Sequence, residues 1–129
     1  MHPWQQHLDQ LKAGFKAPGQ ADADTLKHIS GLEFLRRMIR GKLPTAPISQ
    51  TLDFYLIEAE PGRAVFQGRP THAHYNPIAT VHGGYHATLL DSAMGCAVQT
   101  LSEAGRAYTT LEFKIHCVRP LTESTGPVR

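Results

Sequence analysis

The feature that most constrains the fold is a long helical pattern from about Val81 to Leu101, followed by a segment with the period of a strand. Apolar side chains recur on one face of the helical pattern, and no proline interrupts it. Its many alanine and glycine residues indicate burial. The segment from about Tyr108 to Val118 alternates strictly between apolar and polar residues, which predicts a strand with one buried face.

The first third of the chain predicts two further helices. Apolar residues at helical spacing predict an amphipathic helix over about residues 3–15, which Pro18-Gly19 ends. A second helix is expected to begin at Ser30, because Ser30-Gly31-Leu32-Glu33 fits the capping-box pattern, and to run to about residue 41. Prolines then mark an extended connector.

A hairpin is expected next. Residues 49–60 and 63–68 have the pattern of two short strands around Glu60-Pro61-Gly62-Arg63, a plausible turn. Residues 69–80 are rich in His, Pro, Thr and Asn and have no period, so they predict a loop. The core candidates of the hairpin are Phe54, Leu56 and Val65.

Length and composition restrict the function. A chain of 129 residues that is 41% hydrophobic and 19% charged is typical of one soluble globular domain. No apolar run reaches the roughly 18 residues of a membrane helix, and the start of the chain lacks the layout of a signal peptide, so we expect a cytoplasmic protein without a membrane partner. A net charge of +2 is too small to indicate a nucleic-acid partner. Cys96 and Cys117 are expected to be free thiols.

Candidate chemistry lies on the long helix. His82-Gly83-Gly84 stands at its start, where glycines expose the free amides of the first turn and the helix dipole is positive. Asp91 lies in the third turn on a stripe of small residues with Gly84 and Thr88, so its carboxylate is approachable. Taken singly, each feature has an ordinary explanation, since glycines often serve turns and a helical Asp is often solvated. An Asp on a buried helix, however, needs a partner or a function.

A metal site is the main rival chemistry. Four histidines cluster in the sequence, and the last two are spaced i, i+4 on the helix: His72, His74, His82 and His86. No cysteine or second acid joins them at a ligand spacing. We therefore expect neither a metal nor another cofactor.

The residues around this helix resemble one family. Asn76-Pro77, His82-Gly83-Gly84 and Asp91, nine residues after the histidine, are similar to the hotdog-fold thioesterases of the phenylacetic-acid-degradation type. The similar run extends from Tyr75 to Asp91 (YNPIATVHGGYHATLLD), and the resemblance continues in residues 108–113 and 118–120.

The resemblance implies an α+β hotdog fold, a long central helix wrapped by a curved antiparallel sheet. It implies a homodimer or homotetramer that binds acyl-CoA at a subunit interface and hydrolyses the thioester to free acid and CoA. Asp91 would be nucleophile or general base, and the Gly83 amide would polarise the carbonyl. The remaining site positions are Asn76, His82 and Thr110 as catalytic residues, and Gly84, Tyr85 and Thr88 as substrate-binding residues.

The sequence departs from that family pattern at its end. We expect an N-terminal helical extension at residues 1–48 and a hotdog core at residues 49–129, which stops where the next strand of the family would begin. About two or three strands would then be missing, which leaves an open edge. A shortened chain or a partner that supplies the strands would each account for this. A non-catalytic module that binds acyl-CoA or mediates oligomerisation stays an alternative, because a fold alone does not establish a function.

Overall fold

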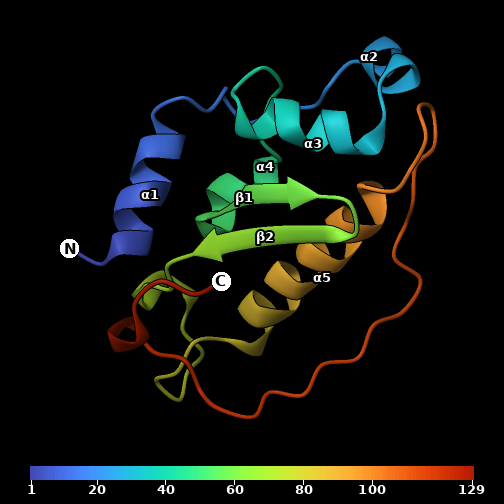
Figure 1. Ribbon diagram of the computed structural model, residues 1–129. Coiled ribbons are helices and arrows are strands. Elements are labelled where there is room, and N and C mark those ends of the chain that lie inside the picture. Colours follow the sequence, from blue (N-terminus) through green and yellow to red (C-terminus); the bar gives the residue numbers. More distant parts are fainter.

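In the computed structural model, which describes residues 1–129, one long helix lies across a two-stranded antiparallel sheet (Figure 1). The helix is α5 (Gly83–Gln99), and the strands are β1 (Phe54–Glu60) and β2 (Arg63–Gly68). The long helix predicted from the sequence is confirmed, and so is the α+β class.

The hairpin has the predicted turn but a shorter first strand. Glu60 pairs with Arg63, and Gly62 between them has a φ of 75°, a left-handed conformation that glycine adopts without strain. The prediction of strand structure from residue 49 was wrong, because α4 (Pro47–Leu52) occupies the start of that segment. Pro47 is suited to the first turn of a helix, and Asp53 ends α4 in a left-handed conformation.

The N-terminal third contains α1 (Pro3–Lys12), α2 (Ala23–His28) and α3 (Gly31–Ile39). The predicted helices α1 and α3 are confirmed, although α1 ends at Lys12, before Pro18-Gly19. The sequence reading missed α2, a six-residue helix capped by Asp22. The Ser30 hydroxyl accepts a hydrogen bond from the Glu33 amide at 3.2 Å, as the capping pattern predicts.

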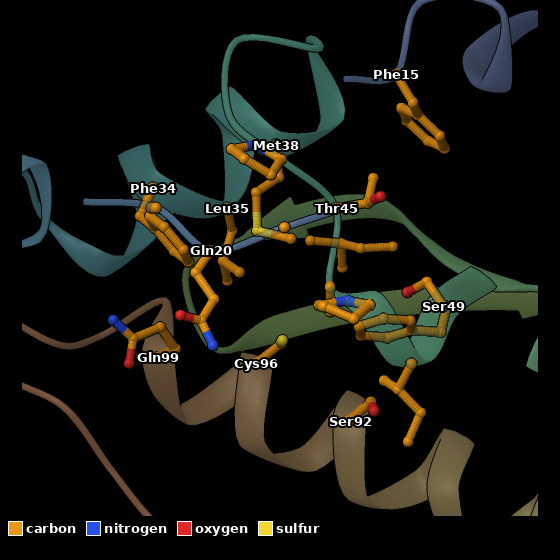
Figure 2. Close-up of a pocket in the computed structure, with 18 of the residues that line it drawn as sticks. Phe15, Gln20, Phe34, Leu35, Met38, Thr45, Ser49, Ser92, Cys96 and Gln99 are labelled. Carbon is orange, nitrogen blue, oxygen red and sulfur yellow. The ribbon is translucent and has the colours of Figure 1, made fainter. Parts of the chain in front are cut away.

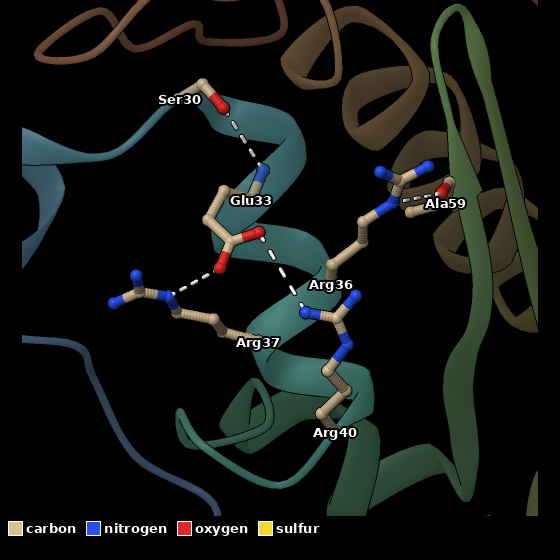
Figure 3. A network of polar contacts seen from close by, with 6 residues as sticks. All are labelled: Ser30, Glu33, Arg36, Arg37, Arg40 and Ala59. Atoms are coloured by element: carbon tan, nitrogen blue, oxygen red, sulfur yellow. Dashed lines mark hydrogen bonds and ion pairs between the residues drawn. The ribbon is translucent and has the colours of Figure 1, made fainter.

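A capping box would also have the Glu33 carboxylate accept a hydrogen bond from the Ser30 amide. In this structure the Glu33 carboxylate forms ion pairs instead (Figure 3). The Glu33 carboxylate accepts a hydrogen bond from Arg37 Nε at 2.8 Å and lies 4.0 Å from Arg40. Arg36 Nε donates to the carbonyl of Ala59, which links α3 to β1. Arg36 on the charged face of α3 thus connects this helix to β1.

The hydrophobic core joins the N-terminal third to the hairpin. Its buried members are Leu35, Phe54, Leu56, Ala59 and Phe66, and α5 adds Leu89, Ala93 and Cys96. Phe54 and Leu56 are core residues as predicted, whereas Val65 is only partly buried. The division of the chain at residue 48 stays a prediction. None of the helices has the length and apolar character needed to cross a membrane.

The predicted strand from Tyr108 to Val118 was wrong, since these residues form no strand. They cross the outside of the molecule as an extended arc after α5 (Figure 1). The alternating pattern is present, but a strand also needs a neighbour that receives its backbone hydrogen bonds, and no strand lies beside this segment. Leu111 and Val118 of this segment consequently face outward and are 94% and 93% exposed. The outer edge of β2 is met only by Val128, which exchanges two backbone hydrogen bonds with Gly68.

Candidate functional site

The loop before α5 is closed by Asn76. Its side-chain oxygen accepts hydrogen bonds from the amides of Ile78 (3.0 Å) and Thr80 (3.1 Å), and its side-chain nitrogen donates to the Thr80 hydroxyl at 2.8 Å. These bonds hold Ala79 in a left-handed conformation. The chain then pairs Tyr75 with Val81, and the His82 amide donates to the His74 carbonyl. Asn76 therefore fixes where α5 begins.

The first turn of α5 leaves one amide free. His82 is the N-cap residue, and its Nδ1 accepts a hydrogen bond from the Gly84 amide at 2.8 Å. This bond requires an Nδ1 without a proton. The Gly83 amide donates to no group of the protein. Gly83 is exposed, and a methyl group there would meet nothing within 4 Å.

Asp91 lies two turns further along α5 and is held from outside the helix. The Thr110 hydroxyl donates to its carboxylate at 2.7 Å. Asp91 is partly buried and Thr110 is exposed, and Asp91 forms no ion pair with a basic residue. One carboxylate oxygen therefore has a defined partner, and the group can still act on a molecule that approaches from solvent.

The structure brings Thr110 to Asp91 but does not bring Gly83 to Asp91. The two residues are eight positions apart on one helix, which is about 12 Å along its axis. Thr88, between them, donates its hydroxyl to the Gly84 carbonyl at 2.8 Å. Gly84 itself stands against the His82 ring, since a methyl group there would approach Nδ1 to 2.9 Å.

Tyr85 points away from this surface into the protein. It is 3% exposed, and its ring packs against that of His74 with centroids 4.7 Å apart. The hydroxyl lies beneath Gly68, where a methyl group would clash with it, and burial raises the pKa of Tyr85. The structure thus gives Tyr85 a packing role under the hairpin.

The four clustered histidines serve different local contacts. His74 Nδ1 accepts from the Thr71 amide, and the His72 ring packs against Tyr75. His82 caps α5, and both ring nitrogens of His86 are buried without a hydrogen-bond partner. No three metal-ligating side chains gather anywhere in the chain.

Sequence reasoning missed a second group of residues beside Asp91. Tyr108 lies across Gly95, where a methyl group would come within 2.2 Å of the tyrosine hydroxyl. Burial raises the pKa of the nearby Cys96 thiol to about 11. Burial, followed by the nearby Cys96 and the charge of Asp91, raises the pKa of Tyr108. The only sequence signal was Gly95, whose missing side chain makes room for the ring.

These residues border a cavity of about 540 Å³ between α3, α4, β1 and α5 (Figure 2). Ser92, Cys96 and Gln99 form its wall on α5. Tyr108, two residues before Thr110, lines it as well.

Comparisons with known proteins show which proteins this chain is similar to. The family model described as Thioesterase superfamily matches residues 79–125, which include the free amide, Asp91 and Thr110. One similar crystal structure is that of a phenylacetic acid degradation-related protein from Ralstonia eutropha JMP134, which carries a provisional thioesterase name. It is 26% identical, with a TM-score of 0.65 over 73% of this chain and 71% of that one.

The chain resembles the hotdog-fold thioesterases. The resemblance seen in the sequence is thereby confirmed, as is the hotdog class. A second similar structure, the PaaI protein of the E. coli phenylacetic acid degradation operon, has a TM-score of 0.57 at 22% identity and supports the fold. That match covers 75% of this chain and 64% of the PaaI chain. No curated protein matches the sequence.

Proposed function

We propose that this protein hydrolyses acyl-CoA thioesters, with Asp91 as nucleophile or general base and the Gly83 amide as the donor to the carbonyl oxygen. The observation that carries the proposal is the Asp91 carboxylate, partly buried on α5 and held at 2.7 Å by the Thr110 hydroxyl. The match of residues 79–125 to the Thioesterase superfamily supports thioester chemistry at this position.

The free amide supplies the second requirement. As a thioester carbonyl is attacked, negative charge develops on its oxygen, and a preorganised backbone amide stabilises that charge. Gly83 offers such an amide at the positive end of a 17-residue helix. The Asp91 carboxylate either attacks the carbonyl carbon or takes a proton from the attacking water. The carbon–sulfur bond then breaks, and CoA leaves as a thiolate that takes up a proton. If water attacked, the free acid forms in this step. If Asp91 attacked, the acyl group forms an anhydride with the carboxylate, and water then hydrolyses this anhydride to the free acid and restores Asp91.

The two groups must come from two copies of the chain. One thioester cannot contact both Gly83 and Asp91 of one helix, because about 12 Å separates them along its axis and reacting atoms must approach to about 3–3.5 Å. Two antiparallel α5 helices related by a twofold axis pair Gly83 of each chain with Asp91 of the other. We therefore propose a homodimer or homotetramer with shared sites.

The decisive experiment measures thiol release from a panel of acyl-CoA thioesters by the purified protein and by Asp91→Asn. We expect turnover to fall at least about a hundredfold, because the substitution removes charge and basicity at nearly constant volume. Asp24→Asn is the matched control, since Asp24 is exposed on α2. Absence of thiol release from every substrate, or equal turnover by Asp91→Asn, would overturn the proposal.

Mixing two inactive variants tests the shared site. In a 1:1 mixture of Asp91→Asn and a chain damaged only at Gly83, random re-pairing makes about half of the dimers mixed, each with one complete site of two. About a quarter of the wild-type activity should therefore return. A mixture that gives only the sum of its parents would place both residues in one chain.

A non-catalytic module that binds acyl-CoA or mediates oligomerisation is the second candidate. The exposed apolar row of α5 agrees with oligomerisation, which both candidates require. Leu90, Met94, Val98 and Leu101 are between 43% and 69% exposed, as expected for a surface that a further subunit covers. Binding of acyl-CoA without thiol release would identify this function.

A further inference from the structure

A large cavity lined by Tyr108, two residues before the Thr110 that holds Asp91, is not used by the proposed chemistry. Its volume is about 540 Å³, within the usual range of ligand pockets, and 13 of its 21 lining residues are hydrophobic. None of the 21 carries a charge. Its walls come from the N-terminal third of the chain as well as from the sheet and α5, whereas the family match begins at residue 79.

The cavity runs along α5. Ser92, Cys96 and Gln99 follow one another at helical spacings of four and three on the face that lines it, and Figure 2 shows all three on the same side of the helix. Seven residues of helix are about 10 Å long. The cavity thus extends about 10 Å from the level of Asp91 toward the C-terminal end of α5.

Its far end is closed by α3. A methyl group on Gly31 would overlap the Gln99 carbonyl, so the start of α3 lies directly on the end of α5. Phe34, one turn further along α3, lines the cavity and lies beside Gln99 in Figure 2. Tyr108, which lies across Gly95, borders the cavity at a level between Ser92 and Gln99.

From this arrangement, and resting on the proposed thioesterase function, we infer that the cavity holds the acyl group, and that the substrates are uncharged acyl-CoA thioesters of medium chain length. Tyr108 lines the cavity, and Thr110, two residues further along the same segment, donates to Asp91, so the carboxylate and a wall of the cavity are joined by three consecutive residues. We place the carbonyl carbon at Asp91 and the acyl chain in the cavity beside it. The chain that provides Asp91 therefore also provides the acyl pocket.

The length of the cavity sets the length of the acyl group. A fully extended backbone advances about 3.3–3.6 Å over three bonds, or about 1.2 Å per bond. A cavity about 10 Å long accommodates about eight such bonds. An acyl group of about eight carbons therefore fills it, a much shorter one leaves part of the apolar wall without contact, and a much longer one meets Phe34.

The lining excludes acyl groups with a charged end. A carboxylate or ammonium group placed near Phe34, Leu35 and Met38 would find no opposite charge, and burial of an unpaired charge is costly. The side chains of Gln20 and Gln99 lie at this end and make no hydrogen bond within the chain, so a terminal hydroxyl group is compatible with the pocket.

Two substitutions should move the chain-length preference in opposite directions. Cys96→Phe fills the middle of the cavity, and we expect kcat/KM for octanoyl-CoA to fall at least about tenfold while that for butanoyl-CoA changes less than about threefold. Phe34→Ala opens the far end and should raise the ratio of dodecanoyl-CoA to octanoyl-CoA turnover about tenfold. Opposite shifts cannot result from a general loss of folding. Gln10→Phe is the control, since Gln10 is exposed on α1 and does not line the cavity.

Binding of the non-hydrolysable thioether S-octyl-CoA, measured by calorimetry, separates the two proposals. If no thioester is hydrolysed but thioether affinity follows chain length and shifts with both variants, the proposed function fails and the pocket assignment stands. If thioesters are hydrolysed but the chain-length profile of wild type is flat, or neither variant shifts it, the pocket assignment is overturned and the proposed function stands.

Discussion

Replacement of Gly83 by proline removes the proposed carbonyl donor and little else. Gly83 is the first residue of α5, where proline is favoured because its fixed φ suits the helix and its missing N–H is not needed. In this chain the Gly83 amide has no partner to lose, and a side-chain atom there meets nothing within 4 Å. His82 has φ −58° and ψ 136°, the extended conformation that a residue before proline prefers.

The expected effects on stability and on catalysis therefore have opposite signs. Proline at a compatible position raises the free energy of unfolding by about 0.4–1 kcal/mol, since the unfolded chain loses freedom. Loss of one preorganised donor to a developing oxyanion costs about 10²–10³ in kcat, or about 2.7–4 kcal/mol. Ground-state binding should change little, because the charge on the oxygen develops only in the transition state.

The assay compares Gly83→Pro with Gly83→Ala, which also adds a side-chain carbon but keeps the N–H. Urea unfolding should give both variants a free energy of unfolding equal to that of wild type or up to about 1 kcal/mol higher. Thiol release should then be at least about thirtyfold slower for proline than for alanine, with equal affinity for S-octyl-CoA. Equal turnover by two folded variants would show that the Gly83 amide does not act on the carbonyl.

Three further predictions follow from other contacts. A thiol reagent at pH 8 should label Cys117, which is exposed, much faster than Cys96, whose pKa burial raises to about 11; equal rates followed by mass spectrometry would contradict this. The hydrogen bond from Arg37 lowers the pKa of Glu33. The stabilising effect of this bond is therefore present above the ordinary glutamate pKa and is lost as the pH falls through the lowered pKa. Urea unfolding should show that Glu33→Gln destabilises the fold at pH 7 but not at pH 2. Thr110→Val should lower kcat about tenfold with little change in KM, whereas Thr110→Ser retains activity, since only serine keeps the hydroxyl bond to the carboxylate.

The parts of the fold that the sequence predicts correctly are those determined by neighbours along the chain. A helix satisfies its hydrogen bonds internally, so apolar spacing and a cap such as Ser30 are enough to locate α3 and α5. The turn at Gly62 is equally local. The short helix α4 was missed because its six residues contain a serine, a threonine and an isoleucine, a composition that also suits a strand.

The segment from Tyr108 to Val118 shows the limit of this reasoning. Alternation indicates which side chains could share a face, but strand formation depends on a neighbouring strand that may lie far away in sequence. Here the segment is attached to α5 through side chains instead, with Tyr108 across Gly95 and Thr110 on Asp91. The cavity was unpredictable for the same reason, since its walls come from both ends of the chain.

The paired glycines at the start of α5 have different roles, which the sequence could not distinguish. The motif predicts two exposed first-turn amides, yet the His82 ring turns back and takes the Gly84 amide, so only the Gly83 amide can reach a ligand. A side chain at Gly84 would press on that ring, whereas one at Gly83 would not touch the protein. In the proposed mechanism, His82 thus determines which amide is left as the donor. A histidine suits the position before the glycines because its Nδ1 can accept the hydrogen bond of the Gly84 amide. Asn76 contributes indirectly, since its hydrogen bonds close the loop that places His82 at the start of α5.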